Sequence, residues 1–115
     1  MQFFGYTLAD ESVPMPEPTP EQMAEMGKFV QEAIDAGVIV ATGGMAPTAM
    51  GVKVSSQDGE YTVVDGPFAE AKEIVGGWVL YDVDSMEEAV AWSKRFLAVL
   101  GTDAEVRIRP TFGPE

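Results

Sequence analysis

The feature that most constrains the fold of this chain is a pair of helical segments, each bounded by a start and a stop signal. In the first segment, Thr19 can cap the helix, Pro20 suits the first helical position, and Gln22 completes a capping box. Gly37 supplies a C-terminal stop. The apolar residues between these signals recur at helical spacing, which predicts a core-facing stripe. They are Met23, Met26, Val30, Ala33 and Ile34.

The second helical segment begins with Ser85 and Glu88, which form the capping-box pattern S-x-x-E, and it ends at Gly101. Its apolar positions also fall on one helical face. They are Met86, Ala89, Val90, Ser93, Phe96, Leu97 and Leu100, with Ser93 as the polar exception.

The remaining chain is predicted to form six strands and one long loop. The strand ranges are Gln2–Leu8, Val38–Ala41, Gly51–Ser55, Glu60–Val64, Gly76–Val83 and Ala104–Pro110. A turn signal at residues 57–59 (QDG) joins the third and fourth strands as a hairpin. Residues 9–20 (ADESVPMPEPTP) are rich in proline and are predicted to be a surface loop.

The resulting order is β-α-β-β-β-β-α-β, and without the middle hairpin it is the ferredoxin-like pattern β-α-β-β-α-β. We therefore predict one α+β domain over residues 1–115, with an antiparallel sheet covered on one face by two helices. Trp78 and Leu80 alternate with Val79 and Tyr81, so both faces of the sheet are apolar. An uncovered apolar face favours a partner, which predicts a homodimer with its sheets packed face to face as an α/β barrel.

Composition excludes several classes of function. The chain has 115 residues, 46% of them hydrophobic, with no cysteine and no histidine. Disulfides, thiolate zinc sites and a histidine base are therefore absent. The net charge of −12 disfavours nucleic acid and anionic membrane surfaces. No long apolar run or secretory signal is found, and we expect a cytoplasmic protein without a cofactor.

The stretch VVDGPFAEAKE, residues 63–73, begins as a strand and becomes a long connection rather than a tight turn. Gly66 before Pro67 fixes an extended or turn-like path, and Phe68 is expected to be an apolar pin in the body or in a partner subunit. Two carboxylates and one ammonium group follow. They belong to Glu70, Lys72 and Glu73.

Two interpretations of this stretch are open. Asp65 could be a general acid or base if burial raises its pKa, with Lys72 holding an anionic group. Alternatively, Asp65 accepts backbone N–H bonds in the turn and Lys72 forms salt bridges, which we favour. A magnesium or calcium site on Asp65, Glu70 and Glu73 is a third, weaker option, and we predict no metal.

Other candidates have structural explanations of equal or greater weight. Gly43-Gly44 lacks the rest of a phosphate-loop motif, so close backbone approach or a bulge is favoured. Arg107 and Arg109 alternate on one strand face and could bind a carboxylate, or pair with the abundant acids. The hydroxyl groups of Tyr6 and Tyr81 could reach a cleft.

The segment DGPFAEAKE, followed by IVGGWVLYDVDSMEEAVAWSKR, resembles the YCII-related family, in particular its DGPF branch. The first helix, residues 43–44 and the closing VRIRP are similar to the same family. This resemblance implies a dimeric α/β barrel with a ferredoxin-like protomer, but no assigned reaction. Some relatives carry a His–Asp pair, which a chain without histidine cannot have.

Together these observations predict a protein that binds a small organic ligand in a cleft near the dimer interface. Proton-transfer or lyase-type chemistry would use Asp65 and Lys72, with Gly66, Pro67, Phe68, Glu70 and Glu73 shaping the site or the interface. The alternative is a non-catalytic dimeric module for ligand sensing or protein interaction, in which DGPFAEAKE braces the dimer.

Overall fold

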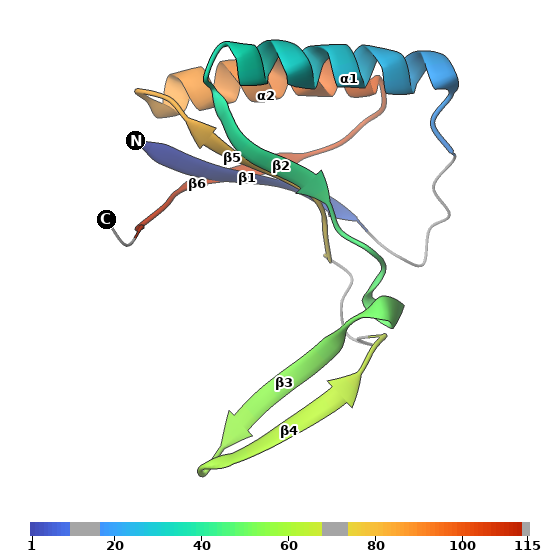
Figure 1. The fold of residues 1–115 in the computed structure, drawn as a ribbon, viewed down its shortest axis with the longest axis vertical. Helices are drawn as coiled ribbons and strands as arrows, with labels where there is room; N and C mark the ends of the chain where they lie inside the picture. The colour runs from blue at the N-terminus through green and yellow to red at the C-terminus, as the bar shows by residue number, and fades with distance from the viewer. Residues whose placement is uncertain (10–16, 68–73, 114–115) are drawn as a thin grey trace.

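The computed structural model describes residues 1–9, 17–67 and 74–113, and its elements follow the predicted order (Figure 1). The strands are β1 (Gln2–Ala9), β2 (Ile39–Gly44), β3 (Val52–Gln57), β4 (Glu60–Asp65), β5 (Ile74–Asp82) and β6 (Val106–Pro110). The helices are α1 (Pro20–Asp35), α2 (Met86–Leu100) and a short 3-10 turn, η1 (Thr48–Met50). Most of the predicted proline-rich loop, residues 10–16, lies outside the described residues.

The predicted helix boundaries are confirmed by their capping geometry. Thr19 Oγ1 accepts a hydrogen bond from the Gln22 backbone N–H at 3.1 Å, and Gln22 Oε1 accepts one from the Thr19 N–H at 2.9 Å. Ser85 Oγ accepts from the backbone N–H three residues on, at the start of α2. Gly37 and Gly101 follow the two helices in the left-handed region, with φ of +73° and +74°.

The predicted inward stripe of α1 is wrong at both ends. Met23 is 61% exposed and Ile34 is 46% exposed, whereas Phe29 and Ala33 are buried. At 3.6 residues per turn, Met23 and Ile34 both lie more than a quarter turn from Phe29, on the same side of the helix. The inward face therefore includes Phe29, which the predicted stripe left out, together with Ala33.

Four strands form an antiparallel sheet in the order β2-β5-β1-β6, and the two helices cover one of its faces (Figure 1). The β3–β4 hairpin forms a separate two-stranded sheet. This arrangement confirms the predicted α+β class, the ferredoxin-like order and the inserted hairpin.

Strand register divides the sheet into a helix-covered face and a face that we call the open face. Phe3 pairs with Tyr81 and Gly5 with Val79, and these residues belong to the helix-covered face. The alternate positions point the other way. The open face carries Phe4, Tyr6, Trp78, Leu80, Arg107 and Arg109.

The helix layer is held to the sheet by a small aromatic core. Phe29 of α1 lies 6.0 Å from Trp92 of α2 between ring centroids, and Arg95 stacks over both rings. Arg95 also donates to Glu32 at 2.7 Å, which links the two helices. Phe3, Tyr81, Val83 and Ala89 form the buried cluster beneath them. Neither α1 nor α2, nor any other helix in the described part of the chain, is long and apolar enough to cross a bilayer.

Residues 52–65, which we call the arm, project from the far end of the sheet on the side opposite the helices (Figure 1). Its turn has Asp58 and Gly59 at φ of 53° and 80°, as the two central residues of a tight hairpin turn require. The arm gives the chain a radius of gyration of 16.3 Å, compared with about 13 Å for a compact 100-residue domain.

Candidate functional site

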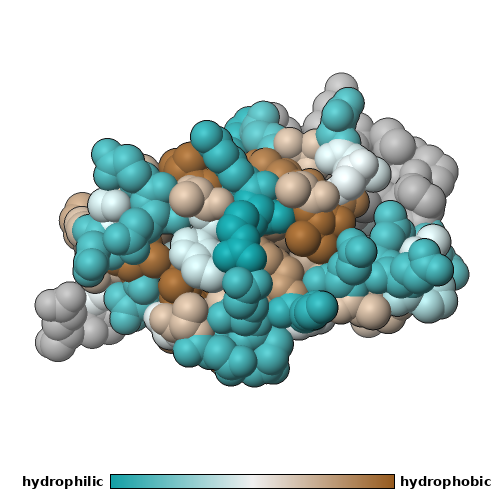
Figure 2. All heavy atoms as spheres, turned by 90° about the horizontal axis from the view of Figure 1, so that it is seen from above, coloured by the Kyte–Doolittle hydropathy of each residue, from teal (hydrophilic) through white to brown (hydrophobic). Residues whose placement is uncertain are grey.

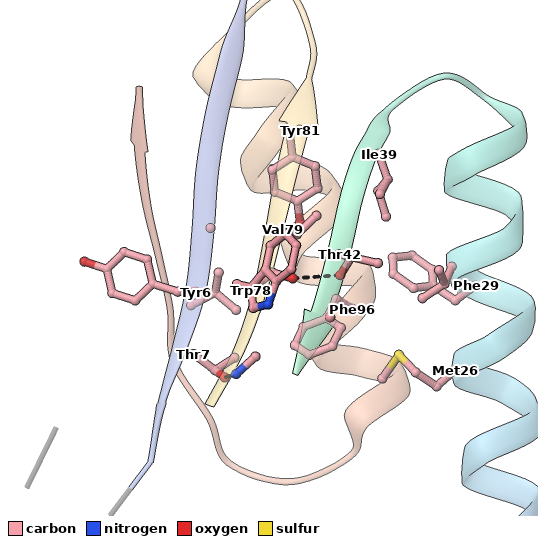
Figure 3. A pocket seen from close by; sticks show the side chains of 15 residues that line it. Tyr6, Thr7, Met26, Phe29, Ile39, Thr42, Trp78, Val79, Tyr81 and Phe96 are labelled. Atoms are coloured by element: carbon pink, nitrogen blue, oxygen red, sulfur yellow. Dashed lines mark hydrogen bonds between the residues drawn. The ribbon is translucent and has the colours of Figure 1, made fainter. Parts of the chain in front are cut away.

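A cavity of about 280 Å³, partly open to solvent, lies between the helix layer and the sheet (Figure 3). Met26 and Phe29 reach it from α1, Phe96 from α2, and Val79 and Tyr81 from β5. The other lining residues come mainly from β1, β2 and β6. They are Gly5, Tyr6, Thr7, Val30, Ile39, Thr42, Gly43, Gly77, Trp78 and Val106.

Two strand positions in the lining of the cavity that face the helices are glycines, Gly5 and Gly77. A Cβ on Gly5 would lie 3.1 Å from a methyl of Val79 and 3.4 Å from the ring of Tyr81. A Cβ on Gly77 would lie 3.4 Å from Thr7 Oγ1. Larger side chains at these two positions would press on Val79, Tyr81 and Thr7, which line the same cavity.

Three polar side chains of the cavity, those of Thr7, Thr42 and Tyr81, have hydrogen-bond partners in the protein. The Gly77 N–H donates to Thr7 Oγ1 at 2.8 Å, and Thr42 Oγ1 donates to the carbonyl oxygen of Trp78 at 2.7 Å (Figure 3). The Tyr81 hydroxyl lies 2.8 Å from Ser93 Oγ, within hydrogen-bond distance. These contacts fix the lining and leave it mainly apolar.

Tyr81 is the titratable side chain that is most enclosed beside the cavity. Burial raises the pKa of its phenol above the ordinary value of 10.0, and the hydrogen bond with Ser93 offsets part of that rise. The hydroxyl is therefore protonated at neutral pH. Tyr81 lines the cavity, and its hydroxyl, engaged with Ser93, keeps the capacity for a further hydrogen bond. That this hydroxyl reaches into the cleft stays a prediction.

The described residues that line the cavity carry no charged side chain. None of the described residues around the cavity is an Asp, Glu, Lys or Arg. In the part of the chain that the structure describes, no cluster of acidic side chains is suited to hold a metal ion. The cavity is therefore suited to shape and apolar contact, with a few hydrogen bonds, rather than to binding an ion.

The described residues of the predicted DGPF motif, which are Asp65, Gly66 and Pro67, do not line this cavity in the single chain. Asp65 ends β4, pairs across the hairpin with Val52, and is exposed. It is not among the cavity-lining residues. Its acid–base role stays a prediction. Lys72 and three further predicted residues fall outside the described residues. Those three are Phe68, Glu70 and Glu73.

Close backbone packing at the base of the arm requires a glycine at position 66. Its N–H donates to the Gly51 carbonyl oxygen at 2.8 Å, and a Cβ there would overlap the carbonyl of Thr48. The peptide bond to Pro67 is cis. Gly66 therefore lets η1 and the end of β4 come together, which ties the motif to the position of the arm.

Two other sequence candidates have structural roles. A Cβ on Gly43 would lie 3.2 Å from the indole ring of Trp78, which confirms the expected close approach. Arg107 Nε donates to a carboxylate oxygen of Glu105 at 2.6 Å, as in the interpretation that pairs it with an acid. Tyr6 comes from β1, and its ring points away from the helices (Figure 3).

Most residues of the cavity were not predicted as site residues. The sequence did contain a sign of the cavity, because two glycines lie in strands expected to pack under helices. Gly77 is on the same face of β5 as Tyr81, and Gly5 is on the same face of β1 as Phe3, which pairs with Tyr81. Phe29 and Phe96 come from two helices far apart in sequence. Their meeting required the packing of both helices, which a motif search does not provide.

Comparisons with known proteins give three similarities. The chain is 28% identical over 88 residues to the uncharacterized protein R00369 of Rhizobium meliloti (strain 1021), covering 76% of this chain and 71% of that protein. A solved structure of 5-chloro-2-hydroxyhydroquinone dehydrochlorinase (TftG) from Burkholderia phenoliruptrix AC1100, in complex with 2,5-dihydroxybenzoquinone, has a TM-score of 0.49 and 14% identity. That comparison covers 98% of this chain and 96% of the other.

The third similarity is to a protein family. The YCII-related domain matches residues 1–111, nearly the whole sequence. The chain belongs to the YCII-related domain family.

Proposed function

We propose that this protein binds a small, uncharged and largely apolar organic molecule in the cavity between its helices and its sheet. The observation that carries this proposal is the apolar lining, in which the described residues bear no charge and the side chains of Thr7, Thr42 and Tyr81 already have hydrogen-bond partners. A charged ligand would lose its hydration there without gaining an opposite charge.

The dimensions of the cavity support a ligand of modest size. An apolar cavity of roughly 150 Å³ is enough to admit benzene, and this one measures about 280 Å³. Phe29 and Phe96 offer aromatic surfaces from the two helices, and the Tyr81 hydroxyl offers one hydrogen-bonding group. Such a combination binds by shape and apolar burial, with a polar contact fixing orientation.

The proposal is tested by NMR titration of protein with labelled methyl groups, using indole as a neutral probe and indole-3-acetate as its charged counterpart. Indole is expected to shift the methyl signals of Ile39, Val79 and Val106, and indole-3-acetate to bind much more weakly. Val30→Phe, which adds a ring to the cavity wall, should abolish the indole shifts. Val90→Phe is the matched control, since Val90 is 37% exposed on α2 and is not a lining residue.

Two results would refute cavity binding. One is the absence of methyl shifts with indole at millimolar concentration. The other is equal binding to wild type and Val30→Phe, with shifts confined to surface methyl groups. Circular dichroism of the two Phe variants establishes that both retain the helices.

We also propose that the protein is a homodimer in which the open faces of two sheets pack together. Phe4 stacks against Trp78 on this face with ring centroids 6.3 Å apart, and Tyr6 lies 5.8 Å from Phe4. An aromatic face without a covering layer in the described chain favours burial against a partner. Gel filtration with light scattering should give a dimer at micromolar concentration, and a 12.4 kDa monomer would refute this arrangement.

Membership of the DGPF branch and a chemical role for Asp65 and Lys72 are part of the same proposal. In one chain Asp65 lies outside the cavity, so acid–base chemistry on a bound ligand would require a partner chain to bring the carboxylate there. Asp65→Asn and Lys72→Met separate the alternatives. Loss of turnover with unchanged ligand binding supports catalysis, whereas loss of melting temperature alone supports a brace for the dimer.

A further inference from the structure

The arm, residues 52–65, is a two-stranded hairpin with no third strand and no covering layer in the described structure. In the described structure, β3 and β4 pair with each other and form a sheet of two strands. Every residue of both strands is exposed. An isolated two-stranded hairpin is marginally stable in water, and independent stability normally needs a third strand or a covering layer.

One face of the arm concentrates its apolar side chains. In an antiparallel pair, residues directly opposite each other share a face. Val54 pairs with Val63, and Tyr61 lies on the same face opposite Ser56. Val54 and Val63 are each 65% exposed, and Tyr61 is 78% exposed. The opposite face pairs Ser55 with Thr62 and Gln57 with Glu60, with Val64 as its apolar exception.

The arm lies on the same side of the molecule as the open face of the sheet. Figure 1 shows the helices above the sheet and the arm slanting below it. Figure 2, which looks onto the helix layer, shows mainly hydrophilic side chains interrupted by separate apolar patches. The open face and the arm together therefore offer a partner two apolar surfaces on one side of the chain.

We propose that the apolar face of the arm packs against a second copy of this chain, so that the two arms clasp the dimer from either side. This inference rests on the proposed homodimer and adds to it a second contact surface. The sheets would meet through their open faces, and each arm would extend over the other protomer.

The size of a stable interface favours this partner. An interface of standard size involves roughly 20–30 residues on each side. The open face provides few large side chains, chiefly Phe4, Tyr6, Trp78 and Leu80, so an interface of ordinary size needs further surface. The arm supplies that surface, because its 14 residues continue directly from the same side of the sheet.

Charge distribution favours the same partner. On the apolar face of the arm, Asp65 lies opposite Val52, whereas Glu60 and the cation Lys53 belong to the other face. The open face of the sheet carries Arg107, which also pairs with Glu105, and Arg109. In a chain with a net charge of −12, a contact between two copies would otherwise be repulsive. Asp65 over the side of the partner that bears arginines gives opposite charges in proximity.

The test is sedimentation velocity of the full chain over a range of concentrations, with three proteins compared. Val54→Ser/Val63→Ser removes the central apolar pair of the arm. Val64→Ser makes the same change on the opposite face of the arm, where the side chain is 50% exposed, and is the control. Because the double variant removes four buried valines per dimer, its dissociation constant should rise by about tenfold or more. The control should stay within about twofold of wild type.

Each outcome decides between the two proposals. A wild-type dimer that only the double variant weakens supports the arm contact. A wild-type dimer that the double variant leaves unchanged, or that Val64→Ser weakens equally, overturns the arm contact and leaves the homodimer standing. A monomeric wild type overturns both. Far-ultraviolet circular dichroism excludes loss of the helices as the cause of any change.

Discussion

The hydrogen bond between Tyr81 and Ser93 makes a quantitative prediction about the wall of the cavity. The two hydroxyl oxygens are 2.8 Å apart, and each of the two residues is 4% exposed. Tyr81→Phe would leave the Ser93 hydroxyl without this partner, and Ser93→Ala would leave the Tyr81 hydroxyl without it. The double variant removes both hydroxyl groups together and leaves neither unpaired.

The expected magnitudes follow from the burial of this pair. Leaving one buried polar group unsatisfied costs about 1–3 kcal/mol, whereas replacing both groups by apolar ones can be nearly neutral. We therefore expect each single variant to lose about 1–2 kcal/mol of unfolding free energy, and the double variant to lose no more than the larger single loss. With 115 residues, an unfolding entropy of about 2.1 cal/mol/K per residue makes 1 kcal/mol equivalent to about 4 °C in melting temperature.

Urea unfolding of the four proteins in a double-mutant cycle measures this coupling at fixed protein concentration. A coupling energy of about 1 kcal/mol or more is the predicted result. Strictly additive losses, within about 0.3 kcal/mol, would refute the reasoning, because they would show that the two hydroxyl groups do not satisfy each other.

The remaining predictions concern backbone packing and pH. Gly66→Ala should lose about 1–3 kcal/mol in urea unfolding, because its Cβ would overlap a backbone carbonyl. Gly27→Ala should gain up to about 1 kcal/mol in the same assay, since this exposed position in α1 has open space around it. Burial raises the Tyr81 pKa, so the folded state holds that proton more tightly, and the stability this contributes is lost as pH rises above about 10. The melting temperature should therefore fall less steeply between about pH 9 and pH 11 for Tyr81→Phe than for wild type. The exposed control Tyr61→Phe should follow wild type.

Local signals in the sequence were sufficient to place the secondary structure. Thr19 and Gln22 act on neighbouring backbone groups, and Gly101 sets the end of its own helix, so their effects can be read without tertiary information. The alternation around Trp78 and Tyr81 likewise indicated two apolar faces, and the register confirms the division. The ferredoxin-like order followed from these elements and was confirmed.

The cavity and the inward face of α1 depend on contacts that local signals do not contain. Met23 fits the helical spacing, but the direction of the helix face is set by Phe29 packing on Trp92 of the other helix. The cavity is lined by Gly5 on the sheet and by side chains from both helices, so its shape depends on how the layers meet. The sequence motif around Asp65 led us to predict a site at the base of the arm. The structure gives its neighbour Gly66 a packing role there.

The most direct test of ligand binding in the cavity is a crystal structure of the protein under xenon pressure, since apolar cavities take up xenon. We expect a xenon peak in the anomalous map, bounded by Phe29, Val79 and Phe96, with the surrounding side chains in their unliganded positions. A map without xenon between the helices and the sheet, with Met26 or Phe96 filling that space, would contradict it.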